Sequence, residues 1–581
     1  MGLPRAILAH KKGDFQEASQ HYQRALQQNS DNPAIYQNYG ALLKKFGHEA
    51  EAHKIYQKGL QKFPDHPGIL RNFANLNRDE NPIFAVELYF KIASILIQNP
   101  AFDKDDLFKS VCDDLVEMLY NLKLHSWCLL LIKKLVAEID QLSPNIFKYL
   151  VLLAENDDDL SHETKSLIQR LSRSLVESES LLDVSNLDFA LASHCLKKRE
   201  FEDAYKLYSQ AITRIHDSSS IIDSHQEDLQ RSIDCNSWNF ACACLPLGKL
   251  DPGWKLFEFG LRTPADGPQK WQRALPKPFS SNELPLWRGQ MNDNFKLLLL
   301  EEQAIGDVMM FLTLLPSFIK NFAFVGVYLS ERLLTIYERS FSVDIRAGRL
   351  KFYTKKDLSA NTLKAQDFDY QSPIGSICQY CFTDFKQYSQ TAPVLMSEQK
   401  LSDKLRDQYL GVGQQKELLI GISWKGGGRG PRIKQKSIEP DQFGRLMLSA
   451  PSVRFIDLQY GDTQKQISKW KEMDIDVIHD DNINPLKDMD SWLAQVDACD
   501  AVLSVANTTI HGAGGLNKPT LCLLSIYSDW RWLVSTSISR SYWYPSVGIA
   551  RQSSEGAWDD AFSDVYKWMQ EKCPMPTGPC C

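Results

Sequence analysis

The stretch SVANTTIHGAGGLNKP, residues 504–519, joins an apolar strand to polar side chains that could bind an anion. The apolar run ends at Asn507, Thr508 and Thr509, and a helix that opens with small residues follows. Asn is a favoured helix N-cap, and the free N–H groups of a first turn, together with the helix dipole, attract anions. The threonine hydroxyls can add donors, and His511 projects from the same helix face as Asn507. The stretch therefore predicts an anion site; the alternative is a simple helix cap with a core histidine.

Basic residues gather in a second stretch, WKGGGRGPRIKQKSI at 424–438, directly after another apolar strand that ends at Ser423. Glycine leaves backbone amides free, and free amides combined with cations suit a phosphate group. The five cations are Lys425, Arg429, Arg432, Lys434 and Lys436. The alternative for such a run of charge is a solvated loop.

A third polar turn, EQAIGD at 302–307, follows the apolar run FKLLLL. It carries Gln303, Gly306 and Asp307 between a predicted strand and a predicted helix. Ligand crevices of parallel sheets lie at the carboxyl ends of the strands, which is where Asp307 falls. An aspartate here could also be a helix N-cap, and it could fill both roles only if its carboxylate faced the cleft.

Strands that alternate with helices must position these three groups, and this alternation predicts parallel doubly wound sheets. One series begins at FKLLLLEEQAIGD and continues through FAFVGVYLS and RLKFYT. A second begins at ELLIGISWKGGG and continues through VRFIDLQYGD, IDVIHD, AVLSVANTT and TLCLLS. The stretch TAPVLMSEQKLSDKL is predicted to connect the two series. Two Rossmann-like halves in series predict a cleft between them.

The first third of the sequence is periodic. Ala18, Tyr22 and Ala25 recur 34 residues later as Ala52, Tyr56 and Gly59; a shorter third copy carries Ala85 and Tyr89; the spacing returns at Ala204, Tyr208 and Ala211 and at Gly253, Phe257 and Gly260. This pattern resembles the tetratricopeptide repeat, a pair of antiparallel helices. The proline after each copy, at 33 and 67, is predicted to end the second helix. Stacked pairs form a concave groove that usually binds peptides, and residues 101–185 are predicted to be degenerate helical pairs.

Five motifs occur in order behind the repeats: EQAIGD, GISWKGGG with KSI, FIDLQYGD, NTTIHGAGGLNKP, and DWRW with YWYPS. This set, over roughly residues 240–550, resembles bacterial repeat-bearing glycosyltransferases related to lipopolysaccharide heptosyltransferases, and more distantly the O-linked N-acetylglucosamine transferases. The resemblance implies an all-α tetratricopeptide-like N-terminal superhelix followed by an α/β GT-B fold of two Rossmann-like lobes. The expected domains are the repeats (1–262), a linker (263–294), an N-terminal lobe on the acceptor side (295–400) and a C-terminal lobe on the nucleotide-sugar side (416–572).

The resemblance also implies a reaction: transfer of a sugar (hexosyl, heptosyl or N-acetylhexosaminyl) from a nucleotide-diphosphate donor to a protein or glycan acceptor, with inversion and without a metal. Such a transfer requires a base for the acceptor proton and positive groups for the departing diphosphate. The resemblance gives Asp307 the first role and Lys436 a place in the second. The other expected donor-binding residues are Ser423, Asn507, Thr508, Thr509 and His511, with Gln303, Gly306 and Lys425 in support. No cofactor is expected, and Asp488, Asp490 and Asp500 are expected to be structural.

Two positions depart from the pattern of that family. Ala506 stands where the family often has an aspartate, and Ala304 stands where relatives commonly have a glycine. The first departure leaves open a non-catalytic repeat scaffold with a degenerate glycosyltransferase-like domain. A nucleotide enzyme of another kind on the same two-lobed fold, such as a sugar-nucleotide epimerase, is a second alternative.

A chain of 581 residues requires several domains, and its 43% hydrophobic and 24% charged residues are typical of globular proteins. The net charge of −6 gives no general attraction to nucleic acid. There is no signal-like start and no apolar run near the ~20 residues of a membrane span, so a cytoplasmic location is expected. The 13 cysteines are expected to be reduced thiols. The CxxC pair Cys378 and Cys381 lacks a second pair of zinc ligands, and Cys580 and Cys581 are expected to form a flexible tail.

Overall fold

The chain forms two compact units in a computed structural model. One unit comprises Met1–His194 and Gln210–Ser220, and the other comprises Cys195–Ser209 and Ile221–Cys581. The structure describes residues 2–28, 31–98, 104–138, 146, 149–150, 152–153, 167, 181–218, 226–261, 273, 278–388, 394–411, 418–427, 431–450 and 453–572. Most of the 263–294 linker before 278, Arg429 and the terminal cysteines therefore lie outside the described residues.

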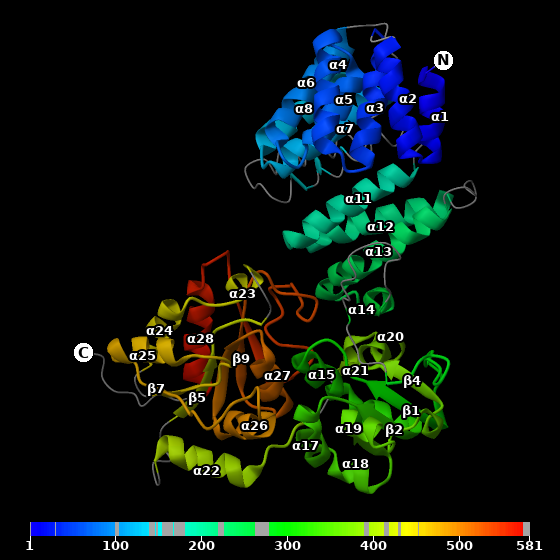
Figure 1. The fold of residues 1–581 in the computed structure, drawn as a ribbon. Coiled ribbons are helices and arrows are strands. Elements are labelled where there is room, and N and C mark those ends of the chain that lie inside the picture. The colour runs from blue at the N-terminus through cyan, green and yellow to red at the C-terminus, as the bar shows by residue number, and fades with distance from the viewer. Residues whose placement is uncertain are drawn as a thin grey trace. The chain divides into compact units, whose positions relative to one another are not determined.

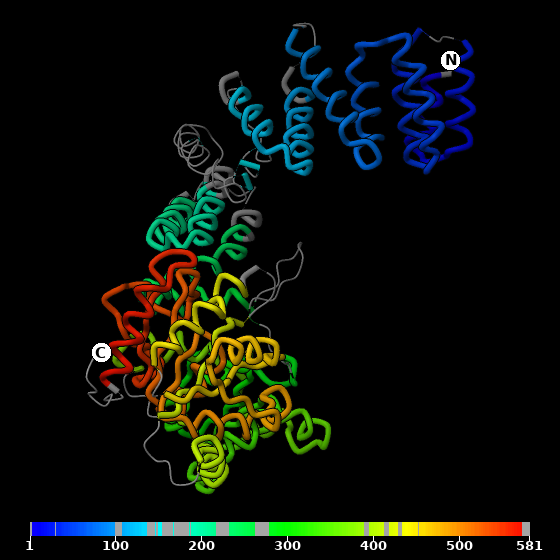
Figure 2. Tube along the Cα trace, turned by 90° about the vertical axis from the view of Figure 1, so that its left-hand side faces the viewer, coloured from blue at the N-terminus to red at the C-terminus, as the bar shows by residue number. Residues whose placement is uncertain are grey.

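Paired helices build the first unit (Figures 1 and 2). They are α1 (Gly2–Lys12), α2 (Phe15–Gln28), α3 (Pro33–Lys45), α4 (Glu49–Lys62), α5 (Pro67–Asn77), α6 (Pro82–Gln98), α7 (Lys104–Asn121) and α8 (His125–Glu138). Helix α1 packs on α2, α3 on α4, and α5 on α6, and neighbouring pairs also touch. Four more helices follow: α11 (Leu181–Lys197), α12 (Phe201–Ser218), α13 (Gln226–Cys244) and α14 (Leu250–Phe257). The helical N-terminal part is thus confirmed, whereas most of 139–180 lies outside the described residues.

Small and aromatic residues at the repeat positions let the paired helices approach closely. Ala18, Tyr22, Ala52 and Tyr56 are all fully buried. Gly40 of α3 faces the ring of Tyr56, and a Cβ atom added to this glycine would lie 2.2 Å from Cε1 of the tyrosine. The spacing of 34 residues therefore repeats a packing contact between helices.

The prolines of the repeats have a different position from the one predicted. Pro33 and Pro67 begin α3 and α5 instead of ending the preceding helices. The residue before each proline is the N-cap: Asn32 accepts a hydrogen bond from the N–H of Ala34 at 3.0 Å, and His66 caps α5 through its ring. Proline suits the first helical position because that position needs no N–H donor and its φ is already helical.

A parallel sheet of four strands opens the α/β part of the second unit. Its strands are β1 (Asn292–Leu300), β2 (Phe322–Tyr328), β3 (Leu350–Tyr353) and β4 (Tyr370–Pro373), in the order β3-β2-β1-β4. Its helices are α15 (Ile305–Phe311), α16 (Leu315–Phe318), α17 (Glu331–Ser340), α18 (Ser342–Arg346), α19 (Lys355–Ser359), α20 (Cys378–Cys381) and α21 (Phe385–Tyr388). The end of β1, 297–300, is buried on both faces, as a central parallel strand requires.

A second parallel sheet has six strands in the order β10-β9-β8-β5-β6-β7. They are β5 (Leu418–Ser423), β6 (Val453–Asp457), β7 (Val477–Ile478), β8 (Ala501–Val505), β9 (Thr520–Leu524) and β10 (Val547–Arg551). Its helices are α22 (Gln399–Leu410), α23 (Pro431–Gln435), α24 (Pro440–Leu448), α25 (Gln464–Glu472), α26 (Met489–Ala498), α27 (Thr508–Gly515) and α28 (Asp559–Lys572). The predicted α/β architecture with parallel sheets is confirmed.

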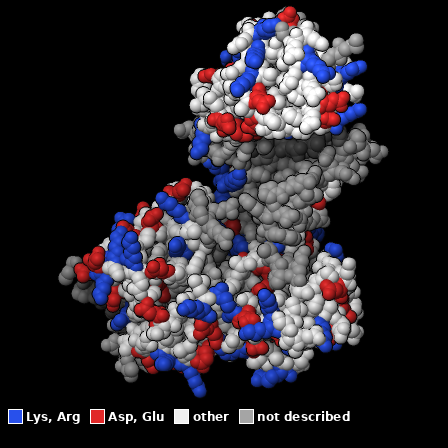
Figure 3. All heavy atoms as spheres, in the orientation of Figure 1, with Lys and Arg blue, Asp and Glu red and all other residues white. Residues whose placement is uncertain are grey.

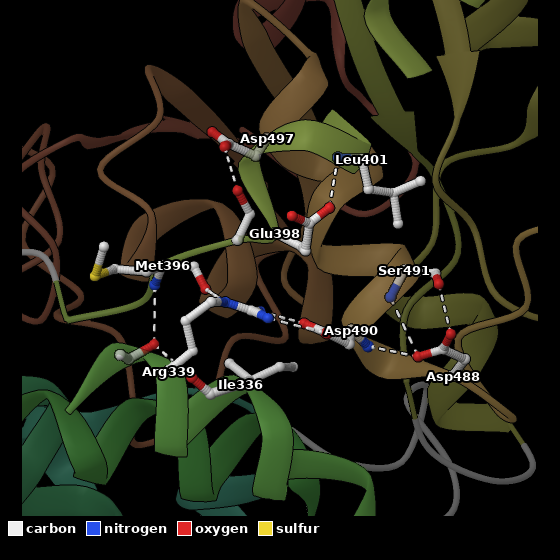
Figure 4. Close-up of polar contacts among 11 residues, drawn as sticks. Ile336, Arg339, Met396, Glu398, Leu401, Asp488, Asp490, Ser491 and Asp497 are labelled. Atoms are coloured by element: carbon white, nitrogen blue, oxygen red, sulfur yellow. Dashed lines mark hydrogen bonds and ion pairs between the residues drawn. The ribbon is translucent and has the colours of Figure 1, made fainter. Parts of the chain in front are cut away.

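Polar contacts hold the segment between the two sheets in place (Figure 4). Arg339 of α17 donates to the carboxylate of Asp490 in α26 at 3.0 Å and to the carbonyl of Met396 at 2.9 Å. Ser397 donates to the carboxylate of Asp497, again in α26. The predicted connector therefore ends in a helix, α22, and touches helices of both sheets.

The three aspartates expected to be structural have structural partners. Asp488 caps α26 and accepts the N–H of Asp490 at 2.9 Å, and Asp490 pairs with Arg339. Asp500 pairs with Arg406 of α22 at 2.9 Å. These contacts fix helices next to the six-stranded sheet, so the structural expectation is confirmed.

Acidic and basic side chains are interspersed over the face in Figure 3, in keeping with a net charge of only −6. Within the described ranges, no helix is both long enough and apolar enough to cross a bilayer. Cys378 is buried and Cys381 is partly buried, and both are free thiols. Reduced thiols at this CxxC pair stay a prediction.

Replacing Gly40 by alanine should destabilise the α3–α4 pair by about 1–3 kcal/mol, because the new methyl group overpacks the buried Tyr56 ring. Helix propensity alone would favour alanine by up to about 1 kcal/mol, so a net loss isolates the steric effect. Hydrogen–deuterium exchange of peptides from α3 and α4 should become faster. The control Glu51→Ala, at an exposed position of α4, should leave exchange unchanged; equal exchange in both variants would contradict the packing argument.

Candidate functional site

The amide of Asn507 lies where the strand order of the six-stranded sheet reverses, between β5 and β8. It donates to Ser423 Oγ at 2.7 Å and to the carbonyl of Lys425 at 3.1 Å. Its oxygen accepts the N–H of Thr509 at 2.9 Å, so the predicted N-cap of α27 is confirmed. In open parallel sheets, ligands bind at such a reversal, outside the carboxyl ends of the strands.

Gln459, just beyond β6, completes this network and was missed by the sequence analysis. Its side-chain oxygen accepts Ser423 Oγ and the backbone N–H of Lys425, both at 2.9 Å. The available signal was a glutamine directly after an apolar strand, in the motif FIDLQYGD. The ends of β5, β6 and β8 are thus cross-linked by side-chain hydrogen bonds.

His511 of α27 faces α15 and is buried. Its Nδ1 shares a hydrogen bond of 3.0 Å with the hydroxyl of Tyr544. Gly306 of α15 packs against the ring, since a Cβ atom there would lie 2.9 Å from His511 Cδ2. Burial lowers the pKa of His511 to about 4, although the carboxylate of Asp307 acts in the opposite direction. The imidazole is therefore neutral at pH 7 and can only act as a hydrogen-bonding group there.

Asp307 is the third residue of α15, and the N-cap of this helix is Ala304. The alternative of Asp307 as N-cap is therefore wrong in detail: its Oδ2 reaches back and accepts the N–H of Ala304 at 3.1 Å. Its Oδ1 accepts Nε of Arg531 at 2.6 Å. Gln303, whose φ of 61° is left-handed, accepts Nη2 of the same arginine at 3.2 Å. Asp307 and Gln303 thus meet one guanidinium from the C-terminal sheet.

A buried ion pair supports the turn that precedes Asp307. Arg273 and Glu302 are both fully buried and pair at 2.6 Å. The guanidinium also pairs with Glu258 at 2.7 Å and donates to Ser376 at 3.1 Å. Breaking a buried pair leaves an uncompensated charge, so this network holds the end of β1 firmly.

Lys436 belongs to a second cluster of charges, together with Asp529 and Arg531. Its Nζ pairs with Asp529 Oδ2 at 2.8 Å, and Nη1 of Arg531 contacts the same oxygen at 3.1 Å. Burial raises the pKa of Asp529, but Arg531 and Lys436 outweigh burial and hold it well below its usual range. Burial opposes the charge of Arg531, but Asp307 and Asp529 raise its pKa further. The motif DWRW contains Asp529 and Arg531, which the sequence analysis quoted without assigning a role.

Two adjoining cavities extend from this site. One, of about 240 Å³, has apolar walls that include Tyr460 and Met489, and it also touches Ala304, Thr508 and Thr509. The other, of about 230 Å³, is mostly polar. Its polar lining includes Asp457, Gln459, Thr463, His479, Asp480 and Asn484. Leu458, Pro485, Leu486 and Trp492 line both cavities. Among the described residues, the buried Nε1 of Trp492 has no hydrogen-bond partner.

The structure brings most of the predicted site residues together and leaves some out. Ser423, Asn507 and the backbone of Lys425 share one network, and Thr508 and Thr509 line a cavity. Asp307 and Lys436 belong to one chain of charges, and Gln303 hydrogen-bonds to the arginine of that chain. Lys434 is exposed. Arg429 and the side chain of Arg432 lie outside the described residues.

The stability of the second unit should fall in acid because of His511. Its pKa is 6.5 when exposed and about 4 when folded, so the unfolded state binds the extra proton between these values. Stability is therefore lost as the pH falls from 6.5 to 4, by up to about 3 kcal/mol. Denaturation curves followed by tryptophan fluorescence report this unit, because every tryptophan except Trp127 follows residue 200. His511→Gln should flatten the acid loss, whereas His48→Gln, at the N-cap of α4, should not; a wild-type profile in His511→Gln would contradict the argument.

Comparisons with known proteins give matches to a repeat family, to a curated protein and to solved structures. A tetratricopeptide repeat family model matches residues 9–74. Protein FlbA of Caulobacter vibrioides (strain ATCC 19089 / CIP 103742 / CB 15) is 25% identical over 340 residues, which cover 56% of this chain and 53% of that protein. The chain thus spans about half the length of the curated relative it matches.

Two solved structures are similar to portions of the chain. The glycosyl transferase family 9 structure from Veillonella parvula DSM 2008 covers 49% of this chain and 98% of that chain, with 10% identity and a TM-score of 0.34. YrrB, a TPR protein with an unusual peptide-binding site, covers 33% of this chain and 91% of that chain, with 14% identity and a TM-score of 0.25. With the family model at 9–74, the N-terminal part of the chain carries tetratricopeptide repeats.

Proposed function

We propose that this chain is a GT-B glycosyltransferase that moves a sugar from a nucleotide-diphosphate donor to an acceptor hydroxyl. One observation carries the proposal. The carboxyl ends of β5 and β8, with Asn507 and Lys436, meet Asp307 from the other sheet through a shared arginine. An anion site and a carboxylate base on facing sheets are the two groups that glycosyl transfer from a diphosphate requires.

The diphosphate binds at the start of α27 in this proposal. The helix begins with Thr508 and Thr509 after the Asn507 cap. The N–H of Thr509 is bonded to Asn507, so the N–H of Thr508, the two threonine hydroxyls and the positive end of the helix dipole are the groups that receive the anion. Lys436 adds a positive charge on the same edge of the sheet, held there by Asp529. His511, which is neutral at pH 7, acts through hydrogen bonds and contributes no charge.

The nucleoside occupies the two adjoining cavities. The apolar cavity, with Tyr460, Met489 and Trp492 in its wall, suits a planar base. The polar cavity offers carboxylates and amides, such as Asp480 and Gln459, that accept or donate hydrogen bonds to ribose hydroxyls. The unpartnered Nε1 of Trp492 supplies a buried donor between them.

The chemical step is a direct displacement at the anomeric carbon. The acceptor oxygen forms its bond to that carbon while the bond to the diphosphate breaks, and Asp307 takes the acceptor proton. The negative charge that develops on the diphosphate is stabilised by Lys436 and by the α27 dipole. Inversion and independence from metal ions follow from the family resemblance. The repeats recruit the acceptor, a protein or a glycan, through their concave face.

Nucleotide binding tests the proposal. Thermal unfolding of the full chain is measured with UDP, GDP, ADP, CMP and dTDP, for the wild type, Lys436→Ala and the control Lys434→Ala, an exposed lysine two residues away in α23. A ligand at 100 times its Kd stabilises the folded state by about 2.7 kcal/mol. We expect one nucleotide to raise the Tm of the wild type and of Lys434→Ala by several degrees, and to raise that of Lys436→Ala much less.

The outcome separates the proposal from its alternatives. No stabilisation by any nucleotide would overturn the proposal in favour of a repeat scaffold with a degenerate domain, which Ala506 leaves open. Release of free nucleotide from a nucleotide sugar only in the presence of an acceptor distinguishes transfer from epimerisation, because an epimerase keeps its nucleotide on the sugar.

A further inference from the structure

Four charges of alternating sign form a continuous chain across the site. Lys436 pairs with Asp529 at 2.8 Å, Asp529 pairs with Arg531 at 3.1 Å, and Arg531 donates to Asp307 at 2.6 Å. The positive charges of the two cations and the negative charges of the two carboxylates cancel. A diphosphate that binds next to Lys436 adds negative charge to this balanced set. At least one of the two cations must then leave a carboxylate partner and pair with the phosphate.

Arg531 is the cation that both substrate sites share. Its Nη1 contacts the same Asp529 oxygen as Lys436, so it lies within reach of a phosphate that Lys436 holds. Its Nε and Nη2 meet the carboxylate of Asp307, and Nη2 also meets Gln303. The guanidinium carbon lies over the ring of Trp530, 4.2 Å from its centroid. A guanidinium that contacts an aromatic ring through its face keeps its N–H groups available for other partners.

The same contacts block Asp307 as a base. Oδ1 of Asp307 accepts Nε of Arg531 and is in ion-pair contact with Nη2, and Oδ2 accepts the N–H of Ala304. A carboxylate oxygen offers about two lone-pair directions, so the guanidinium occupies the Oδ1 side and Oδ2 is half filled. An acceptor hydroxyl therefore meets a carboxylate that is already occupied on its cleft side.

We propose that Arg531 is a diphosphate-binding residue whose exchange between Asp307 and the donor couples the two substrate sites. This inference rests on the proposed function. Without a donor, Arg531 occupies Asp307. With a diphosphate beside Lys436, Arg531 turns to the phosphate oxygens and leaves Oδ1 of Asp307 open to the acceptor hydroxyl. Donor binding thus prepares the base, and the acceptor binds productively only afterwards.

The coupling predicts opposite effects of two substitutions on diphosphate binding. Inorganic pyrophosphate is the probe, because it carries the diphosphate without base or sugar, and its affinity for the full chain is measured by isothermal titration calorimetry. Arg531→Gln should weaken binding about 10-fold or more, because a direct ligand is lost. Asp307→Asn should tighten it about 3- to 10-fold, because the asparagine no longer competes for Arg531 while it can still accept the N–H of Ala304.

A double-mutant cycle separates this exchange from simple electrostatics. In the Arg531→Gln background, Asp307→Asn should no longer change pyrophosphate affinity. Tightening of the same size in both backgrounds would reveal only the removal of a negative charge, and it would overturn the inference. Arg531→Lys keeps the charge without the two-pronged geometry and provides a variant with less risk to folding. Arg339→Gln, which removes another arginine between the sheets far along the chain from Arg531, is the control and should bind as the wild type.

The experiment distinguishes the inference from the proposed function beneath it. Binding that depends on Lys436 but is unchanged in Arg531→Gln, or not tightened by Asp307→Asn, overturns the exchange and leaves the diphosphate site standing. Pyrophosphate binding that is absent, or insensitive to Lys436→Ala, overturns both. Tryptophan fluorescence melts of each variant verify that it is folded at the temperature of the titration.

Discussion

The side-chain amide of Asn507 joins the two strands between which the six-stranded sheet reverses its order. It donates to Ser423 and to the backbone after β5, and its oxygen starts α27. A buried amide must satisfy all of its hydrogen-bonding groups, so this one side chain sets the ends of two strands and the first turn of a helix together. Gln459, at the end of the neighbouring strand β6, also accepts hydrogen bonds from Ser423 and from the backbone after β5. The edge that carries the candidate anion site is therefore rigid before any ligand arrives.

Electrostatics decide how the two sheets meet at this edge. Arg531 and Asp529 follow β9, Lys436 follows β5, and Asp307 follows β1, so the chain of charges gathers side chains from three strand ends. Charges removed from water are stable only when paired, and the pairing draws the carboxylate of α15 to the arginine of the facing sheet. Beneath the same turn, Arg273 and Glu302 repeat this rule in the fully buried state.

Much of the architecture was predictable because it depends on local patterns. The helical repeats follow from small and aromatic residues at a fixed period, and contacts such as Gly40 on Tyr56 are the physical content of that period. The strands follow from short apolar runs, and the N-cap at Asn507 follows from the preference of asparagine for that position. The prolines at 33 and 67 were assigned to the wrong helices, since proline next to a cap starts a helix as readily as it follows one.

The sequence by itself determined the repeats, the parallel α/β elements, and the capping and basic motifs, because hydrophobic period and capping act over a few residues. Only the tertiary structure decided that Asp307 meets Arg531, that Lys436 meets Asp529, and that His511 is buried and neutral against Tyr544. These contacts join residues from about 30 to more than 200 positions apart. They depend on which strand ends converge and on how closely the two sheets pack, and no local preference encodes either property.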